Sequence, residues 1–375
     1  MRTFLSRVIL VLASTAVGLL ACEIALRFTG YEGDDERINT VYYPALGTVR
    51  QDSWILDYRV DPKKQSRVSI RGQIIPLKKD PGEKRVIFIG DSGTEAPYLP
   101  VEKSYPLVFK RRLDRLDPGN RVRIINAGVW GMTTIDEYHF LKEELLVLKP
   151  DIVVLGLFMA NDINFNLGHS AEQIRIRPTF DLIAYLKDRS VLIHYLYLRA
   201  LALNNKYKLV RSDVLTEKSL IPIKLGLIDS YGFHMLNYPL GEVATYMKKS
   251  SRLIDYAFDV LRTVFHQFLR LGATHHFAFR VLLIPTPSAV AGRLAILHHP
   301  RILDDINESG TRISEADLDF TKPTRRVLMI CRELKISCID PTSRMQQIGM
   351  SVFFPQDEHL TELGHEAVAE QLLSH

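Results

Sequence analysis

VIFIGDSGT, at residues 86–94, joins a short run of apolar residues to a glycine, an aspartate and a serine. The run is continuous rather than alternating, which is typical of a strand buried on both faces of a parallel sheet. A serine that directly follows such a strand lies at the carboxyl edge of the sheet, where open α/β sheets build their ligand sites. The stretch therefore predicts an α/β fold and places Ser92 at its functional edge.

Four more apolar runs repeat this pattern along the chain. Between them lie segments whose apolar residues recur at the spacing of a helix. Strands that alternate with helices predict a parallel sheet covered by helices on both faces. We expect Gly272 to end the third of these helices. The further runs are VRIIN (122–126), DIVVLGLF (151–158), FAFRVLLIP (277–285) and KISCID (335–340), and the predicted helices cover 104–116, 134–148, 248–271, 324–334 and 361–373.

The composition of the 375 residues is that of a globular protein, with 46% hydrophobic and 24% charged residues. This length allows one large α/β domain with insertions or two ordinary domains. The net charge of +5 is too modest to indicate nucleic acid as a partner. No spacing of paired His or Asp residues predicts a metal site, and no cofactor is predicted.

The N-terminus predicts a membrane anchor. Arg2 and Arg7 precede an uncharged run over residues 8–22, which Glu23 interrupts. Basic residues before such a run predict a cytoplasmic N-terminus and an exported domain. We therefore expect a signal anchor or transmembrane helix over residues 1–30 and a juxtamembrane segment over 31–84. A lipoprotein cleaved before Cys22 and a plain secreted form are the alternatives.

Two of the three cysteines, Cys331 and Cys338, lie close together in the sequence. They could pair if the domain sits in an oxidising compartment. We favour the plainer interpretation of two unpaired, buried thiols, one on a helix and one on the next strand.

A long insertion interrupts the alternation of strands and helices at about residues 164–242. It contains the apolar and aromatic stretch RSVLIHYLYLRALAL (189–203). We favour a helix packed on the core. A cap that faces the substrate, or a surface that touches the membrane, is the sharper alternative.

Three further segments place polar groups where the site is expected. The second strand leads into a loop that contains Gly131, and the third leads into Asn161. A glycine lets the backbone approach a ligand closely, and an asparagine can donate its side-chain amide. Near the C-terminus, Asp357 precedes His359 by two residues, close enough to hold the imidazole. Each signal alone fits an ordinary turn or helix cap, but together they supply every group that acyl transfer requires. We expect Thr361 to cap the last helix and His365 to serve surface polarity or a contact at a helix start.

These four segments, in this order, resemble the sequence blocks of the SGNH/GDSL hydrolase superfamily. GDSGT resembles its nucleophile block, NAGVWGMTT its glycine block, MANDIN its Asn block and DEHLTELGH its Asp/His block. The resemblance covers roughly residues 68–375, with the insertion only loosely alike. It implies a three-layer α/β/α sandwich, flavodoxin-like, with a five-stranded parallel sheet over residues 85–375.

The resemblance also implies the role of each residue. Ser92 would be the nucleophile and His359 the base, oriented by Asp357. The backbone N–H groups of Ser92 and Gly131, with the side chain of Asn161, would form the oxyanion hole.

The predicted function is that of an esterase that cleaves an O-acyl group from a carbohydrate or a lipid. An O-acetyltransferase that acts on cell-surface polysaccharide is one alternative, and a degenerate member that binds a glycan is another. Met159 and Ala96 stand where the family often has glycine, which bears on substrate size rather than on reaction class. The sequence leaves the oligomeric state open.

Overall fold

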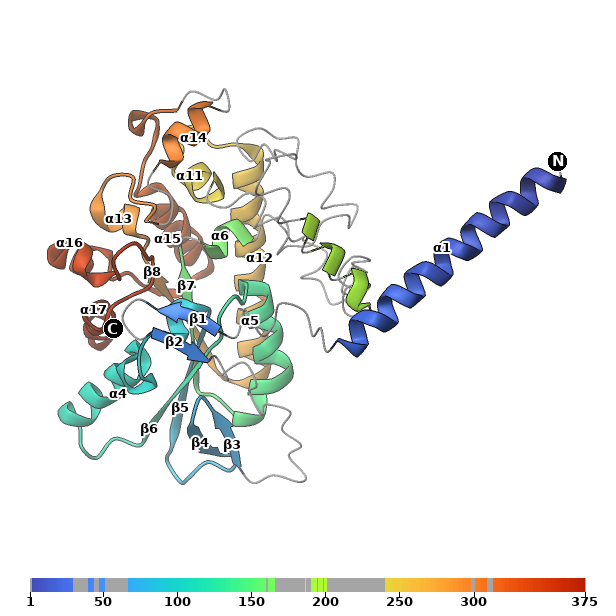
Figure 1. The fold of residues 1–375 in the computed structure, drawn as a ribbon. Coiled ribbons are helices and arrows are strands. Elements are labelled where there is room, and N and C mark those ends of the chain that lie inside the picture. Colours follow the sequence, from blue (N-terminus) through green and yellow to red (C-terminus); the bar gives the residue numbers. More distant parts are fainter. Residues whose placement is uncertain are drawn as a thin grey trace.

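The computed structural model describes residues 2–29, 40–43, 47–50, 67–159, 161–165, 186, 190–193, 195–197, 199–200, 240–297, 301–308 and 313–374. Its centre is a five-stranded parallel sheet of order β6-β5-β7-β8-β9 (Figure 1). The α/β fold and the parallel sheet predicted from the sequence are confirmed, with each strand at one of the apolar runs. The strands are β5 (Lys84–Gly90), β6 (Val122–Gly128), β7 (Ile152–Phe158), β8 (Ala278–Ile284) and β9 (Ser337–Ile339).

Helices cover both faces of the sheet. Alternate strand residues point to opposite faces, so Ile87 and Leu155 enter one core while Phe88 and Val154 enter the other. The first core lies under α5 (Thr134–Phe140), α12 (Arg252–His275) and α15 (Lys322–Leu334). The second lies under α4 (Tyr105–Leu116), α13 (Pro287–Ala291), α16 (Thr342–Ile348) and α17 (Glu362–Leu373). Figure 1 shows α5 and α12 on one side of the sheet and α4 and α17 on the other.

Apart from the N-terminal helix, the remaining described elements are short. They include the antiparallel pairs β1 (Thr40–Tyr43) with β2 (Gly47–Arg50) and β3 (Arg67–Ile70) with β4 (Gln73–Pro76). The second hairpin contributes Val68, Ile70 and Ile75 to the first core. The short helices are α3 (Ser92–Glu95), α6 (Asn161–Phe165), α11 (Leu240–Tyr246) and α14 (Ile302–Glu308).

Helix α12 runs past the residue predicted to end it. Gly272 lies inside the helix, which continues to His275, and His276 then adopts the left-handed conformation that ends it. The amide of Phe277 returns to the carbonyl of Gly272 over 3.0 Å. A Cβ at position 272 would lie 2.7 Å from the Phe277 carbonyl oxygen, so this glycine admits the returning chain rather than stopping the helix.

The two C-terminal cysteines are paired, contrary to the interpretation favoured from the sequence. A disulfide joins Cys331 on α15 to Cys338 on β9. The reason is the short connection between these elements, which brings the two Cα atoms to 6.2 Å, within bonding range.

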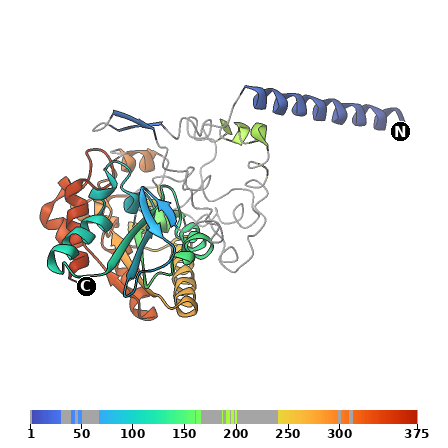
Figure 2. The ribbon, with the colours of Figure 1, turned by 90° about the horizontal axis from the view of Figure 1, so that it is seen from below.

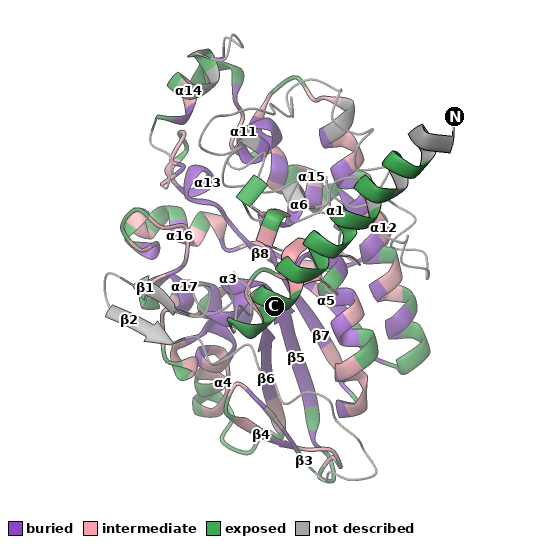
Figure 3. Cartoon of the chain, turned by 45° about the vertical axis from the view of Figure 1, so that its right-hand side comes forward, coloured by how far each residue is buried: buried purple, intermediate pink, exposed green. Residues whose placement is uncertain are grey.

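At the N-terminus, α1 spans Arg2–Phe28 and extends away from the α/β body (Figures 1 and 2). Most of its described side chains are exposed (Figure 3). Glu23 accepts hydrogen bonds from the Ser190 hydroxyl and from the amides of Val191 and Leu192. Among the residues that the structure describes, none of the helices combines the length and apolar character needed to cross a bilayer. Most of the predicted insertion at 164–242 lies outside the described residues.

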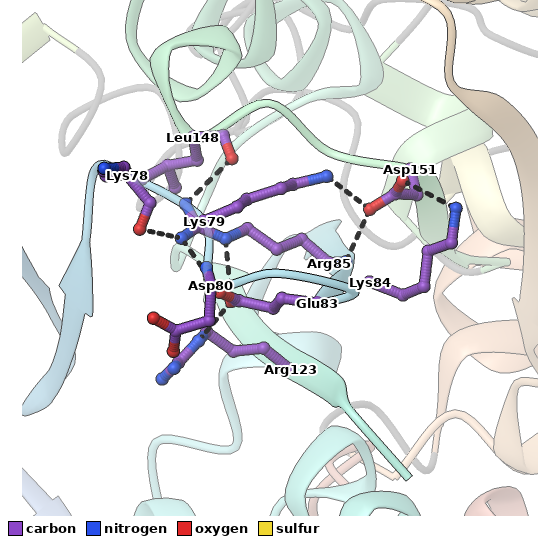
Figure 4. A network of polar contacts seen from close by, with 9 residues as sticks. All are labelled: Lys78, Lys79, Asp80, Glu83, Lys84, Arg85, Arg123, Leu148 and Asp151. Atoms are coloured by element: carbon purple, nitrogen blue, oxygen red, sulfur yellow. Dashed lines mark hydrogen bonds and ion pairs between the residues drawn. The ribbon is translucent and has the colours of Figure 1, made fainter.

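A buried ionic network fixes the amino edge of the sheet, opposite the serine (Figure 4). Arg85 is fully buried and donates to Glu83 Oε1 over 2.9 Å and to the Leu148 carbonyl over 2.9 Å. Asp151 accepts from the Arg85 amide over 2.7 Å and from Lys79. Although burial opposes ionisation, hydrogen bonds from Arg85, the Asp80 amide and Arg123 lower the pKa of Glu83 to about 2.

Replacing Arg85 by methionine leaves the Glu83 carboxylate buried with fewer partners. We expect Arg85→Met to lower the free energy of unfolding by about 3 kcal/mol. Urea denaturation measures this change. The double variant Arg85→Met, Glu83→Gln, which removes the stranded charge, should recover part of the loss. Equal stability of Arg85→Met and the wild type would contradict the role of the network.

The same carboxylate predicts acid sensitivity. The pKa of Glu83 is lower in the folded chain, about 2, than its ordinary value of 4.5. Its contribution to stability is therefore full above pH 4.5 and is lost as the pH falls toward about 2. Unfolding free energies of the wild type and Glu83→Gln, measured from pH 6 down to about 2, should converge over this window.

Candidate active site

Ser92 lies in a tight turn at the carboxyl end of β5. Asp91 caps the one-turn helix α3 by accepting from the Gly93 amide over 2.8 Å. Ala96 then ends the turn in the left-handed conformation. Thr94 packs against the ends of two neighbouring strands, where a Cβ at Gly90 or Gly156 would lie within 2.3 Å of its hydroxyl. Those two glycines therefore allow the turn that carries Ser92.

The structure brings Ser92, His359 and Asp357 together. His359 Nε2 lies 2.9 Å from Ser92 Oγ, although 267 residues separate them in the sequence. On the other side of the ring, His359 Nδ1 lies 2.5 Å from Asp357 Oδ1, which also accepts from the His359 amide over 2.8 Å. A hydroxyl, an imidazole and a carboxylate that contact one another in this order form the arrangement that activates a serine.

Asp357 is held as a carboxylate. Burial alone would raise its pKa, but hydrogen bonds from His359 and Tyr98 and the charge of the imidazolium bring the pKa well below its usual range. The carboxylate therefore carries a negative charge at neutral pH and presents Oδ1 to the imidazole.

Asn161 begins α6, directly after β7 and beside the turn that carries Ser92. Its side-chain amide donates to Asp91 Oδ2 over 2.9 Å. An NH₂ group carries two protons, so this bond orients the amide and leaves it a second proton to donate. Asp91 is itself fully buried, and burial raises the pKa of its carboxyl. Asp91, in the turn that carries Ser92, thus fixes the orientation of the Asn161 amide.

Gly131 lies in the loop after β6, in the left-handed conformation with a φ of +74°. The preceding residue ties this loop to the rest of the site. The Trp130 amide donates to Glu95 Oε2 over 2.6 Å, and the indole stacks on the His359 ring with centroids 5.3 Å apart. Burial raises the pKa of the Glu95 carboxyl. The glycine loop is therefore anchored both to the turn that carries Ser92 and to the imidazole.

Tyr98 and Phe354 complete an aromatic wall beside His359 with Trp130. The Tyr98 ring meets the imidazole edge-to-face at 4.8 Å and Phe354 at 5.4 Å. Sequence reasoning missed Glu95, Tyr98 and Trp130. All three lie within quoted blocks or a few residues from Ser92, but nothing in the sequence indicates which side chains turn toward the imidazole.

His365 is buried, so the prediction of surface polarity is wrong and that of a contact at a helix start is confirmed. Its Nδ1 accepts from the Tyr105 amide at the start of α4 over 3.2 Å, and its ring stacks on Tyr105. Burial lowers the pKa of His365 to about 3, so the ring stays neutral. The predicted cap at Thr361 is also confirmed, with the Gly364 amide as donor.

Two further carboxyls are buried below the site, Glu137 on α5 and Asp162 on α6. Asp162 accepts from the Phe158 amide over 2.7 Å. Burial, and repulsion from neighbouring carboxylates, raise the pKa of both groups well above their ordinary values. In the described part of the chain, no cluster of three or more His, Cys, Asp or Glu side chains could hold a metal ion.

Comparison with known proteins returned no matching family model and no matching curated protein. Among solved structures, the chain is similar to the acetyl xylan esterase AlAXEase at 14% identity and a TM-score of 0.39, covering 77% of this chain and 98% of that one. It is also similar to a catalytic mutant of Axe2, an acetylxylan esterase from Geobacillus stearothermophilus, at 13% identity and a TM-score of 0.40. That match covers 78% of this chain and 94% of the esterase. TesA is similar at 12% identity and a TM-score of 0.37, and the match covers 78% of this chain and 97% of TesA.

Removing the anchor of the glycine loop should weaken catalysis while leaving Ser92, His359 and Asp357 in place. We expect Glu95→Ala to lower kcat by about tenfold, because the Trp130 amide loses its acceptor and the loop relaxes. Steady-state hydrolysis of a chromogenic acyl ester measures the change. Glu95→Gln is the matched control, since its amide oxygen can still accept, and it should retain most of the activity. Full activity in Glu95→Ala would show that the loop is held by other contacts.

Proposed function

We propose that this protein is a serine hydrolase of the SGNH/GDSL type that cleaves an acyl ester. The observation that carries the proposal is the contact of Ser92 Oγ with His359 Nε2 at 2.9 Å, with Asp357 on the opposite ring nitrogen. The three residues come from the nucleophile turn and the loop before α17, at the carboxyl edge of the sheet.

The reaction proceeds in two transfers. His359 takes the proton of Ser92 as Oγ attacks the ester carbonyl, and the resulting imidazolium is stabilised by the Asp357 carboxylate. The tetrahedral oxyanion accepts hydrogen bonds from Asn161 and from the backbone amides of Ser92 and Gly131. As the carbon–oxygen bond breaks, His359 returns the proton to the leaving alcohol, which leaves the acyl group on Ser92. Water then attacks the acyl-enzyme with His359 again as base, releasing the acid.

For the substrate we propose an O-acyl group carried by a carbohydrate or a lipid. The half-buried rings of Tyr98, Trp130 and Phe354 beside His359 support this choice, because they offer flat apolar area to a sugar ring or an acyl chain. A hydrolysis panel of short and long acyl esters and acetylated sugars tests it. Adding a glycan acceptor to the same assay would reveal acyl transfer in place of hydrolysis.

Ser92→Ala should abolish turnover. Loss of the nucleophile should lower kcat by at least ~10⁴-fold, since only binding and the oxyanion donors remain. Ester hydrolysis and labelling by a fluorophosphonate probe measure this independently. Ser314→Ala, at an exposed serine that caps a short turn, is the control and should match the wild type in both assays. Retained hydrolysis in purified, folded Ser92→Ala would refute the proposed function.

We also propose that the catalytic domain is exported and attached to a membrane through residues 1–30. Exposed Leu19, Leu20 and Phe28 on α1 support attachment, and the disulfide between Cys331 and Cys338 fits an oxidising compartment. Cell fractionation with intact mass determination of the mature chain tests this proposal. An uncleaved chain in the membrane fraction is expected. A reduced, soluble chain would overturn the proposal, and a mass that begins at Cys22 or later would identify a lipoprotein or secreted form instead.

A further inference from the structure

We propose that Tyr98 is a positioning residue of the triad, acting through Asp357. The inference rests on the proposed function, because it concerns the same carboxylate. The Tyr98 hydroxyl donates to Asp357 Oδ2 over 2.9 Å, across 259 residues of sequence. No motif in the sequence indicates this contact.

The two oxygens of the Asp357 carboxylate contact different partners. Oδ1 faces His359, accepting from its amide and lying 2.5 Å from Nδ1. Oδ2 is occupied by the Tyr98 hydroxyl. A carboxylate bound on one oxygen alone can rotate about its terminal torsion, which is broad and has little intrinsic preference. The second bond therefore fixes the plane in which Oδ1 meets the imidazole.

The need for this second bond follows from where Asp357 lies. The residue belongs to the loop between the short turn at Met350–Val352 and α17, and its side chain is partly exposed. The loop is closed by the Phe354 amide donating to the His359 carbonyl and the Asp357 amide donating to the Phe354 carbonyl. These bonds hold the backbone, but they leave the carboxylate within reach of water. Tyr98 occupies the oxygen that water would otherwise take.

Tyr98 also fixes the separation between the two halves of the triad. It lies six residues after Ser92, and the left-handed turn at Ala96, closed by the Leu99 amide, directs the chain back over the site. Its ring then packs edge-to-face on His359 at 4.8 Å. One side chain on the serine segment thus contacts both the imidazole and the carboxylate.

A positioning role predicts a particular kinetic pattern. Tyr98→Phe keeps the ring and removes only the hydroxyl, so we expect kcat to fall about tenfold with KM changed less than twofold. In an Asp357→Ala background the hydroxyl has no carboxylate to orient, so Tyr98→Phe should cost less than about twofold there. Steady-state kinetics on a chromogenic acyl ester completes this double-mutant cycle.

Tyr246→Phe is the matched control. It also removes a tyrosine hydroxyl that bonds a carboxylate, Glu242, together with Thr286, but outside the triad. It should lower Tm and leave kcat within twofold of the wild type. If Tyr98→Phe fails to fold, 4-fluorophenylalanine at position 98 fills the volume of the hydroxyl without donating a proton, and the same loss of kcat is expected.

Three results would overturn the proposal. The first is an equal fall in kcat on Tyr98→Phe with and without Asp357. The second is a rise in KM at unchanged kcat, and the third is wild-type kcat in folded Tyr98→Phe. The first would indicate a general structural role and the second a contact with substrate. Failure of the proposed function is distinguishable, because Ser92→Ala would then stay active whatever the outcome at Tyr98.

Discussion

The hydrogen bond between the Ser92 hydroxyl and the His359 imidazole is the contact on which every chemical statement about this molecule depends. It closes a separation of 267 residues, so no local feature of the chain can supply it. What makes it possible is the parallel sheet, because β5 ends at the same edge that the loop before α17 reaches. The buried Arg85 network at the opposite edge holds β5 beside β7 and so fixes the strand that carries the serine.

Around this contact, nearly every element of the site is held by another. Asp91 orients Asn161, Glu95 holds the amide of Trp130, and Tyr98 holds Asp357. These bonds are made by buried or half-buried groups. Several carboxyls are kept there against the cost of desolvation, and Glu137 and Asp162 include oxygens that have no hydrogen-bond partner among the described residues. Such a cost is typical of sites where geometry is maintained at the expense of stability.

The sequence was sufficient for the features that depend on local pattern. Apolar runs marked all five strands because a doubly covered sheet buries both faces of its inner strands, whereas the edge strand β9 is only partly buried. The combination of segments that follow a strand or precede the last helix predicts Ser92, Asn161, Asp357 and His359 as site residues, and the structure brings Ser92, His359 and Asp357 into contact. The sequence could not show which side chains and backbone groups contact one another in the folded chain. The prediction of a helix stop at Gly272 is wrong, because the sequence does not show that the Phe277 backbone passes against this glycine. The predictions of unpaired thiols at Cys331 and Cys338 and of a surface position for His365 are wrong because pairing and burial depend on tertiary contacts.

The stacking of Trp130 on His359 places a fluorescent side chain directly against the imidazole. The sequence contains only two tryptophans, Trp54 and Trp130, and the second lies with its ring 27° from the plane of the imidazole. A proton arriving on that imidazole places a cation against the indole face, where it interacts directly with the π-electrons. The emission of a Trp54→Phe protein would therefore respond to changes at the His359 ring, without an added dye.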